Sequence, residues 1–127
     1  MLFIEKRRLL SFFMFVLIGV EIFYVSSISG SKGVAGNFLI PIIYHFSVFF
    51  LFSFFAFFFV KGKDEIKSGY AIFVLLFSLA YAISDEFHQS FIPLRSPSLG
   101  DIIIDLIGIS FSILISIFMS KESIRSR

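Results

Sequence analysis

Residues 38–60 read FLIPIIYHFSVFFLFSFFAFFFV, a nearly unbroken apolar run with His45 near its start. A helix needs about 20 apolar residues, within a range of roughly 17–25, to cross the hydrocarbon core of a bilayer. The run has this length, and it lacks the apolar–polar alternation of a barrel strand. Backbone N–H and C=O groups in lipid need partners within their own segment, which a helix provides. The run therefore predicts a membrane-spanning helix.

Three further apolar stretches accompany this one. The third of the four along the chain, from Tyr70 to about Ser84, is short and must extend through the polar run 85–89 to cross a bilayer. The composition agrees, because 57% of residues are hydrophobic and only 16% are charged, whereas about a quarter are charged in soluble domains. A soluble fold of this size could not cover so much apolar surface. We expect an all-α polytopic membrane protein forming one domain over 1–127, with four transmembrane helices at about 9–29, 38–60, 70–89 and 101–120.

Basic residues precede the first stretch, join the second to the third, and follow the fourth, whereas the other two loops carry only Lys32 and Arg95. Cytoplasmic loops hold the excess of Lys and Arg, so we expect both termini inside and a multi-pass protein of the cell (cytoplasmic) membrane. A cleaved signal peptide is the alternative for the first stretch, but its apolar region exceeds about 7–15 residues and contains Glu21, which favours an uncleaved helix. The net charge of +2 does not indicate nucleic acid as a partner, and the absence of cysteine excludes disulfides.

Polar residues converge at one end of the expected bundle. Successive helices alternate in direction, so the ends of the first and third helices and the starts of the second and fourth share the leaflet opposite the termini, the outer one. Each carboxylate there needs a partner or a purpose, since at the bilayer centre it costs about 2.5–3.5 kcal/mol. The candidate ligand-binding residues are Glu21, His45, Asp85, Glu86, Gln89, Arg95, Asp101 and Asp105.

Helical spacing places many of these residues on shared faces. Ser78, Tyr81, Asp85 and His88 form one stripe, and Asp101, Asp105, Gly108 and Ser112 form another. Polar and small residues avoid the acyl chains and let helices approach closely, so both stripes should face the interior of the bundle.

Structural interpretations compete with a ligand role. Asp85 and Asp105 would then be buried partners of Arg95, and Asp101 would be the N-terminal cap of the fourth helix. The phenylalanines of 38–60 are expected to form packing and lipid-facing surface. A metal site is conceivable from His45, His88, Asp85, Glu86 and Asp105. No spacing among them matches a metal-ligand signature, so neither a metal nor a cofactor is expected.

Two segments carry a resemblance to a known family. Residues 84–95 read SDEFHQSFIPLR and residues 98–108 read SLGDIIIDLIG. They resemble the signature of the VanZ-like family: Asp-Glu-x-x-Gln, a Pro-Gly-Arg turn, and Asp with Asp/Asn-x-x-Gly at the start of the last helix. Residues 24–27 and 44–46 resemble the family's Ser-containing exit from the first helix and its Lys-x-x-His-Phe region. The residues matched to the family's motifs are Asp85, Glu86, Gln89, Arg95, Asp101 and Asp105, with His45 and Ser26 in the two weaker motifs.

The resemblance has departures and implications. Leu94 stands where the family usually has glycine, and Ile42 where it has lysine. The resemblance implies a small polytopic membrane protein whose founding relative is associated with teicoplanin resistance by a mechanism that is not established.

Four classes of function remain open from the sequence. The leading hypothesis is an envelope protein that engages a membrane lipid, a cell-wall intermediate or a lipoglycopeptide at the outer leaflet. The first alternative is an enzyme that acts on a lipid-linked group by acid–base chemistry, with Asp85, Glu86 and His88 as catalytic candidates. The others are an ion-coupled transporter, which would need to oligomerise, and a structural subunit.

Overall fold

The computed structural model describes residues 2–29, 38–62 and 67–125 of the chain. These residues form four helices and, within these ranges, no strand. Each helix contains a segment long and apolar enough to cross a membrane. The all-α class is therefore confirmed, as are four helices with the length and apolar composition of membrane spans. Lys32 lies outside the described residues. The helices are α1 (Leu2–Ser27), α2 (Leu39–Lys61), α3 (Ser68–Gln89) and α4 (Leu99–Arg125).

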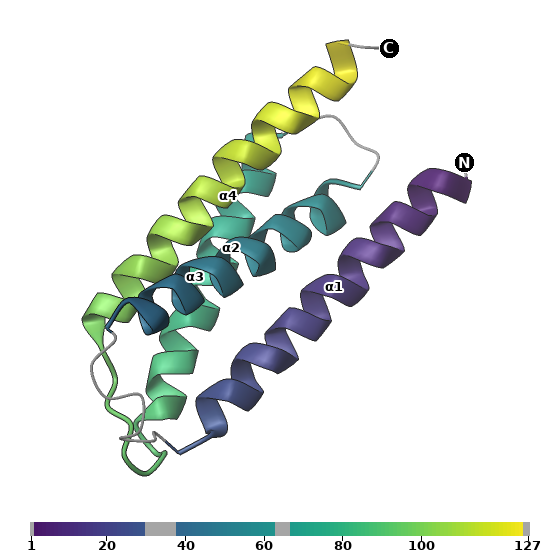
Figure 1. The fold of residues 1–127 in the computed structure, drawn as a ribbon. Helices are drawn as coiled ribbons and strands as arrows, with labels where there is room; N and C mark the ends of the chain where they lie inside the picture. The colour runs from purple at the N-terminus through teal and green to yellow at the C-terminus, as the bar shows by residue number, and fades with distance from the viewer. Residues whose placement is uncertain (1, 30–37, 63–66, 126–127) are drawn as a thin grey trace.

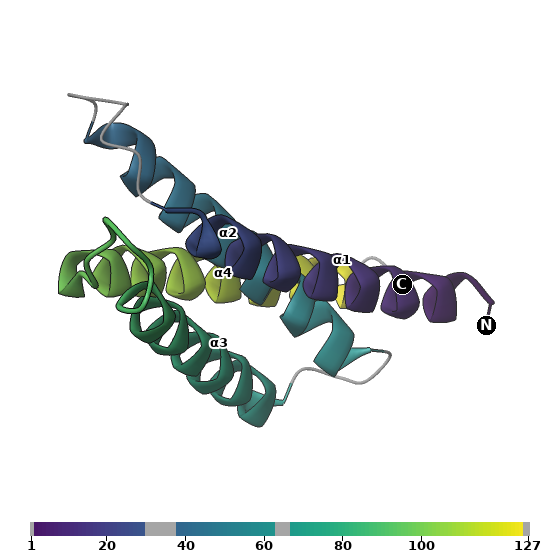
Figure 2. The same ribbon diagram turned by 90° about the horizontal axis from the view of Figure 1, so that it is seen from below.

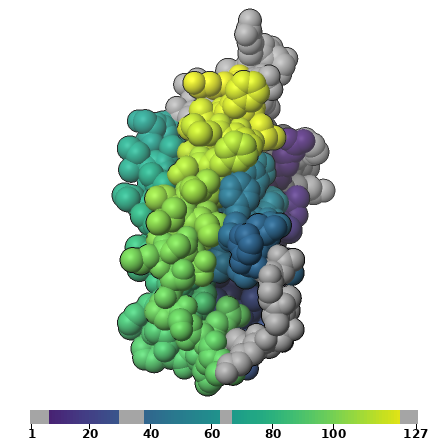
Figure 3. All heavy atoms as spheres, turned by 60° about the vertical axis from the view of Figure 1, so that its left-hand side comes forward, coloured from purple at the N-terminus to yellow at the C-terminus, as the bar shows by residue number. Residues whose placement is uncertain are grey.

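The four helices alternate in direction, so both ends of the chain lie at the same end of the bundle (Figure 1). The connection between α3 and α4 lies at the opposite end, which is also visible from below (Figure 2). Helix α2 contacts each of the other three helices and makes its most extensive contact with α4. Figure 3 shows the face on which α4 lies alongside α2. The parallel pair α2 and α4 is thus the main seam of the bundle.

Aromatic residues of α2 fill the centre of the bundle. Phe49, Phe52 and Phe57 are fully or almost fully buried, and the ring of Phe52 stacks on that of Tyr81 from α3 at 4.8 Å. The outer faces carry large exposed apolar side chains such as Leu114, which is 65% exposed. Water would not tolerate so much apolar surface, whereas lipid covers it without cost. The expected packing role of the α2 phenylalanines is confirmed for these three.

A glycine allows α2 and α4 to approach closely. A Cβ atom at Gly108 of α4 would lie 2.6 Å from the carbonyl oxygen of Phe46 in α2. Small buried side chains, Ser112 and Ser116, continue this face of α4, as is typical of helix packing in membranes. His45 precedes Phe46 and Asp105 lies one turn before Gly108, so the same close approach brings these two polar residues together.

Helices α1 and α4 begin earlier than expected. Helix α1 begins at Leu2, so the helix includes the basic residues that precede the apolar stretch. Helix α4 begins at Leu99, and the hydroxyl of Ser98 accepts the backbone N–H of Asp101 at 3.2 Å. Ser98 is therefore the N-terminal cap, and the expectation that Asp101 caps α4 was wrong. Ser98 directly precedes the helix, the position from which a side-chain oxygen reaches the N–H three residues ahead. Asp101 lies within the first turn, so its carboxyl group is available for other contacts.

Candidate functional site

A histidine–carboxyl pair joins the two helices of the main seam. His45 Nδ1 of α2 lies 3.0 Å from Oδ1 of Asp105 in α4, and Asp105 is fully buried. A carboxylate oxygen accepts, so Nδ1–H donates, whereas Nε2 holds a proton only in the charged form of the ring. Nε2 lies 3.9 Å from Oδ2 of Asp101, whose side chain is 27% exposed. His45 thus lies between a buried carboxyl group and one at the surface.

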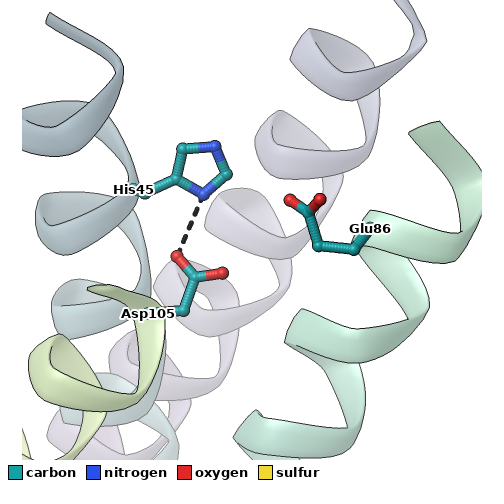
Figure 4. Close-up of side chains that lie close together, drawn as sticks. All are labelled: His45, Glu86 and Asp105. Carbon is teal, nitrogen blue, oxygen red and sulfur yellow. Dashed lines mark hydrogen bonds and ion pairs between the residues drawn. The ribbon is translucent and has the colours of Figure 1, made fainter. Parts of the chain in front are cut away.

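Glu86 brings α3 to the same place. It is only 2% exposed, and two donors fix its carboxyl group: the backbone N–H of Ser98 at 2.6 Å and Nε2 of Gln89 at 3.3 Å. Figure 4 shows His45, Glu86 and Asp105 extending from three helices toward a common region. One nitrogen or oxygen atom from each of these residues lies within 4.8 Å of the other two.

His45, Glu86 and Asp105 form the centre of a polar cluster, which Asp85 and Gln89 extend toward α1. The hydroxyl of Ser26 donates to Asp85 Oδ1, and Gln89 Nε2 donates to Asp85 Oδ2 at 3.0 Å. All three side chains are buried. The amide nitrogen of Gln89 therefore connects the carboxyl groups of Asp85 and Glu86, which are adjacent in sequence.

Arg95 binds backbone carbonyls at the end of α1. Its Nε donates to Ile28 O at 3.2 Å, and its Nη2 donates to Val25 O at 3.0 Å. Its Nη1 lies 3.5 Å from Gln89 Oε1. Among the described residues, no ion pair joins Arg95 to a carboxyl group. The interpretation in which Asp85 and Asp105 pair with Arg95 was wrong, because the guanidinium donates to backbone carbonyls where α1 ends instead.

The remaining candidates lie beside the cluster. Glu21 accepts a hydrogen bond from Tyr44 Oη at 3.0 Å, between α1 and α2. His88 lies 3.0 Å from Ser27 Oγ and stacks on Phe23 at 4.7 Å. No hydrogen bond joins His88 to Asp85 in the described part of the chain, so the histidine–carboxyl pair of this structure contains His45 instead.

Two residues of the site had little signal in the sequence. Tyr44 directly precedes His45 and pairs with Glu21. The backbone N–H of Ser98 donates to Glu86, and the hydroxyl of Ser98 accepts the backbone N–H of Asp101. The cap preference of serine before a helix is the signal that would have identified Ser98.

Acceptors outnumber cations at this end of the bundle. The described cations are Arg95 and, when protonated, His45 and His88. The Oδ2 atom of Asp105 is buried and has no hydrogen-bond partner among the described residues. The arrangement can accept hydrogen bonds or bind a cation. The carboxyl residues that share this end are Glu21, Asp85, Glu86, Asp101 and Asp105.

An open apolar groove of about 320 Å³ begins within a turn of the cluster. Ile42, Ile43 and Phe46 of α2 line one side, and Ile104 and Ile107 of α4 line the other. Because these residues flank His45 and Asp105 in sequence, the groove and the polar cluster belong to the same segment of the seam.

The fold and the cluster together define a multi-pass membrane protein with a polar site assembled by four helices at one end of the bundle. The chain belongs to the VanZ/LLP1 family, whose model matches residues 2–120. The match covers every residue of the cluster and confirms the resemblance seen in the sequence. Comparisons with curated proteins and with solved structures give no match.

Proposed function

We propose that this protein recognises the polar headgroup of an amphiphile at the end of the bundle opposite the chain termini. The observation that carries the proposal is the excess of carboxyl acceptors over cations among buried residues. Carboxyl groups suit ammonium, hydroxyl and amide donors, so the favoured ligand is a headgroup that carries such donors. Membrane lipids, lipid-linked cell-wall intermediates and lipoglycopeptides are the candidate ligands.

The exposure of individual residues supports a defined point of entry. Asp101 has a partly exposed side chain, whereas Asp105 and Glu86 lie deeper. A donor group that enters beside Asp101 would meet the inner carboxyl groups next. The apolar groove between α2 and α4 offers a surface for an acyl chain, so that one molecule would use both features.

The proposed orientation places the site in the outer leaflet of the cytoplasmic membrane. Arg7, Arg8, Lys61, Lys67 and Lys121 all belong to the end of the bundle that carries the termini. This distribution follows the positive-inside rule. A role in glycopeptide resistance would follow if the ligand were a lipoglycopeptide or its cell-wall target.

A second candidate function is an enzyme that acts on a lipid-linked group. The His45–Asp105 hydrogen bond favours it, because a carboxyl group that orients an imidazole is a common arrangement for a general base. The test is turnover of a labelled phospholipid by protein in liposomes. Activity that His45→Gln abolishes and Glu21→Gln retains would support the enzyme, and no turnover above that of empty liposomes would reject it.

Thermal unfolding with three lipid probes tests headgroup recognition. Phosphatidylethanolamine carries ammonium N–H donors, phosphatidylcholine has a cation without them, and phosphatidylglycerol has hydroxyls without a cation. We expect phosphatidylethanolamine to raise the melting temperature most, since a ligand at 100 times its dissociation constant stabilises by about 2.7 kcal/mol. Equal shifts with all three probes would contradict the proposal for lipids.

A further inference from the structure

We infer that His45, Glu86 and Asp105 form a binding site for a divalent transition-metal ion. This inference goes beyond headgroup recognition and does not depend on it. Glu86 and Asp105 would bind the ion, which leaves the partly exposed Asp101 as the acceptor for a headgroup. One donor atom from each residue lies within 4.8 Å of the others, and all three residues are buried. His45 comes from α2, Glu86 from α3 and Asp105 from α4, so the site exists only in the folded bundle (Figure 4).

An unsatisfied oxygen points to the ligand that is missing from this cluster. Asp105 Oδ2 is fully buried, with no hydrogen-bond partner among the described residues. Figure 4 shows this second oxygen of Asp105 on the side that faces Glu86, away from the hydrogen bond to His45. A buried carboxyl oxygen without a partner is costly. A cation bound by both oxygens of Asp105 and by Glu86 would satisfy it.

The His45–Asp105 distance also fits two neighbouring metal ligands. Metal–nitrogen and metal–oxygen bonds of about 2.1 Å place adjacent ligands of one ion roughly 3.0–3.4 Å apart. His45 Nδ1 and Asp105 Oδ1 are already 3.0 Å apart. The proton that they share would be released when the ion binds, as is usual for metal sites. An oxygen of Glu86 lies within 4.8 Å of a ligand atom of each of the other two residues, so Glu86 is the third ligand of the set.

The surrounding residues act as an outer shell for this site. Ser98 N–H and Gln89 Nε2 donate to the Glu86 carboxyl group and fix its orientation. Such supporting hydrogen bonds typify metal sites. One imidazole with two carboxyl groups and no thiolate suits Mn²⁺ or Zn²⁺. Ca²⁺ fits less well, since it requires six to eight oxygen ligands.

Metal titration of purified protein in detergent tests the inference. Protein stripped with EDTA would be titrated with Mn²⁺ and with Zn²⁺, and bound metal measured by calorimetry and elemental analysis. We expect one tightly bound ion per chain, with affinity at least about tenfold weaker in Glu86→Gln and Asp105→Asn. Glu21→Gln is the matched control, because Glu21 pairs with Tyr44 outside the set, and it should bind as wild type does.

Pulsed electron paramagnetic resonance of Mn²⁺ bound to the wild type keeps the inference testable if a variant fails to fold. We expect coupling to one imidazole nitrogen, which His45 supplies. Three results would overturn the inference: no stoichiometric ion in the wild type, equal affinity in all variants that fold, or bound Mn²⁺ without nitrogen coupling.

Discussion

His45 Nδ1 and Asp105 Oδ1 lie 3.0 Å apart between two buried side chains, one on α2 and one on α4. Among the described residues, this is the one histidine–carboxyl contact within hydrogen-bond distance. It joins the two helices that share the most extensive contact in the bundle. The pair should therefore contribute to both the site and the stability of the fold.

The two residues of this pair should be energetically coupled. His45→Ala leaves Asp105 without its only hydrogen-bond donor among the described residues and should cost about 3–5 kcal/mol of unfolding free energy. Asp105→Ala leaves an imidazole N–H unpaired, at a cost of about 1–3 kcal/mol. The double variant should cost less than the sum of both. Equilibrium unfolding in mixed micelles with a chelator measures this, and additive costs would show that the pair does not interact.

Arg95 should hold the end of α1 in place. Arg95→Gln removes donors to Val25 O and Ile28 O, and we expect a loss of roughly 1–2 kcal/mol, since the side chain is half-buried. Hydrogen exchange should become faster at residues 24–29. Arg8→Gln is the control, because Arg8 donates to Phe59 O at the other end of α1. In this variant, hydrogen exchange should become faster only at that end. Unchanged exchange near Val25 in Arg95→Gln would contradict this role.

Gly108 should tolerate no side chain. In Gly108→Ala the new Cβ would lie 2.6 Å from Phe46 O, a backbone atom that cannot move alone. We expect a loss of about 1–3 kcal/mol from overpacking and a weaker contact between α2 and α4. Gly69→Ala has no atom within 4 Å of its Cβ and should be neutral or slightly stabilising. Unfolding in micelles compares the two, and equal stabilities would argue against the close approach.

Leu94 adopts a backbone conformation that suits glycine. Its φ is 63°, in the left-handed region, and its side chain is 70% exposed. Leu94→Gly should be neutral within about 1 kcal/mol, because relief of strain offsets the entropy of glycine. Leu94→Val should be destabilising by about 1 kcal/mol, because a β-branched residue fits this conformation poorly. A Leu94→Val variant more stable than the wild type would contradict this description of the turn.

Much of the fold could be predicted from the sequence, because lipid imposes length and apolarity on each span. The extension of the third helix through Gln89 followed from the length needed to cross a bilayer. The inward face of Asp85 and Asp105 followed from helical spacing. The central position of α2 did not follow, since short loops do not determine which non-consecutive helices pack together. That position depends on the close approach at Gly108, which only three-dimensional packing reveals.

Partners across helices were the least predictable feature. Spacing within α3 placed Asp85 and His88 on one face, yet His88 binds Ser27 of α1, and His45 takes the carboxyl partner. Arg95 was expected to bind carboxyl groups, but backbone carbonyls of α1 were nearer. Periodicity locates a face, whereas the choice between neighbouring partners depends on side-chain direction and helix rotation.

Native mass spectrometry of the solubilised wild type beside Asp101→Asn tests the central claim, headgroup recognition, most directly. Asp101 is partly exposed and lies 3.9 Å from His45 Nε2, so its change to asparagine should cost only about 0.3–1 kcal/mol of helix-dipole stabilisation. The account predicts that the wild type retains phosphatidylethanolamine over phosphatidylcholine and that the variant loses this preference at a similar melting temperature. Equal, non-selective lipid adducts in both proteins would contradict it and would indicate that the polar cluster serves only to hold the helices together.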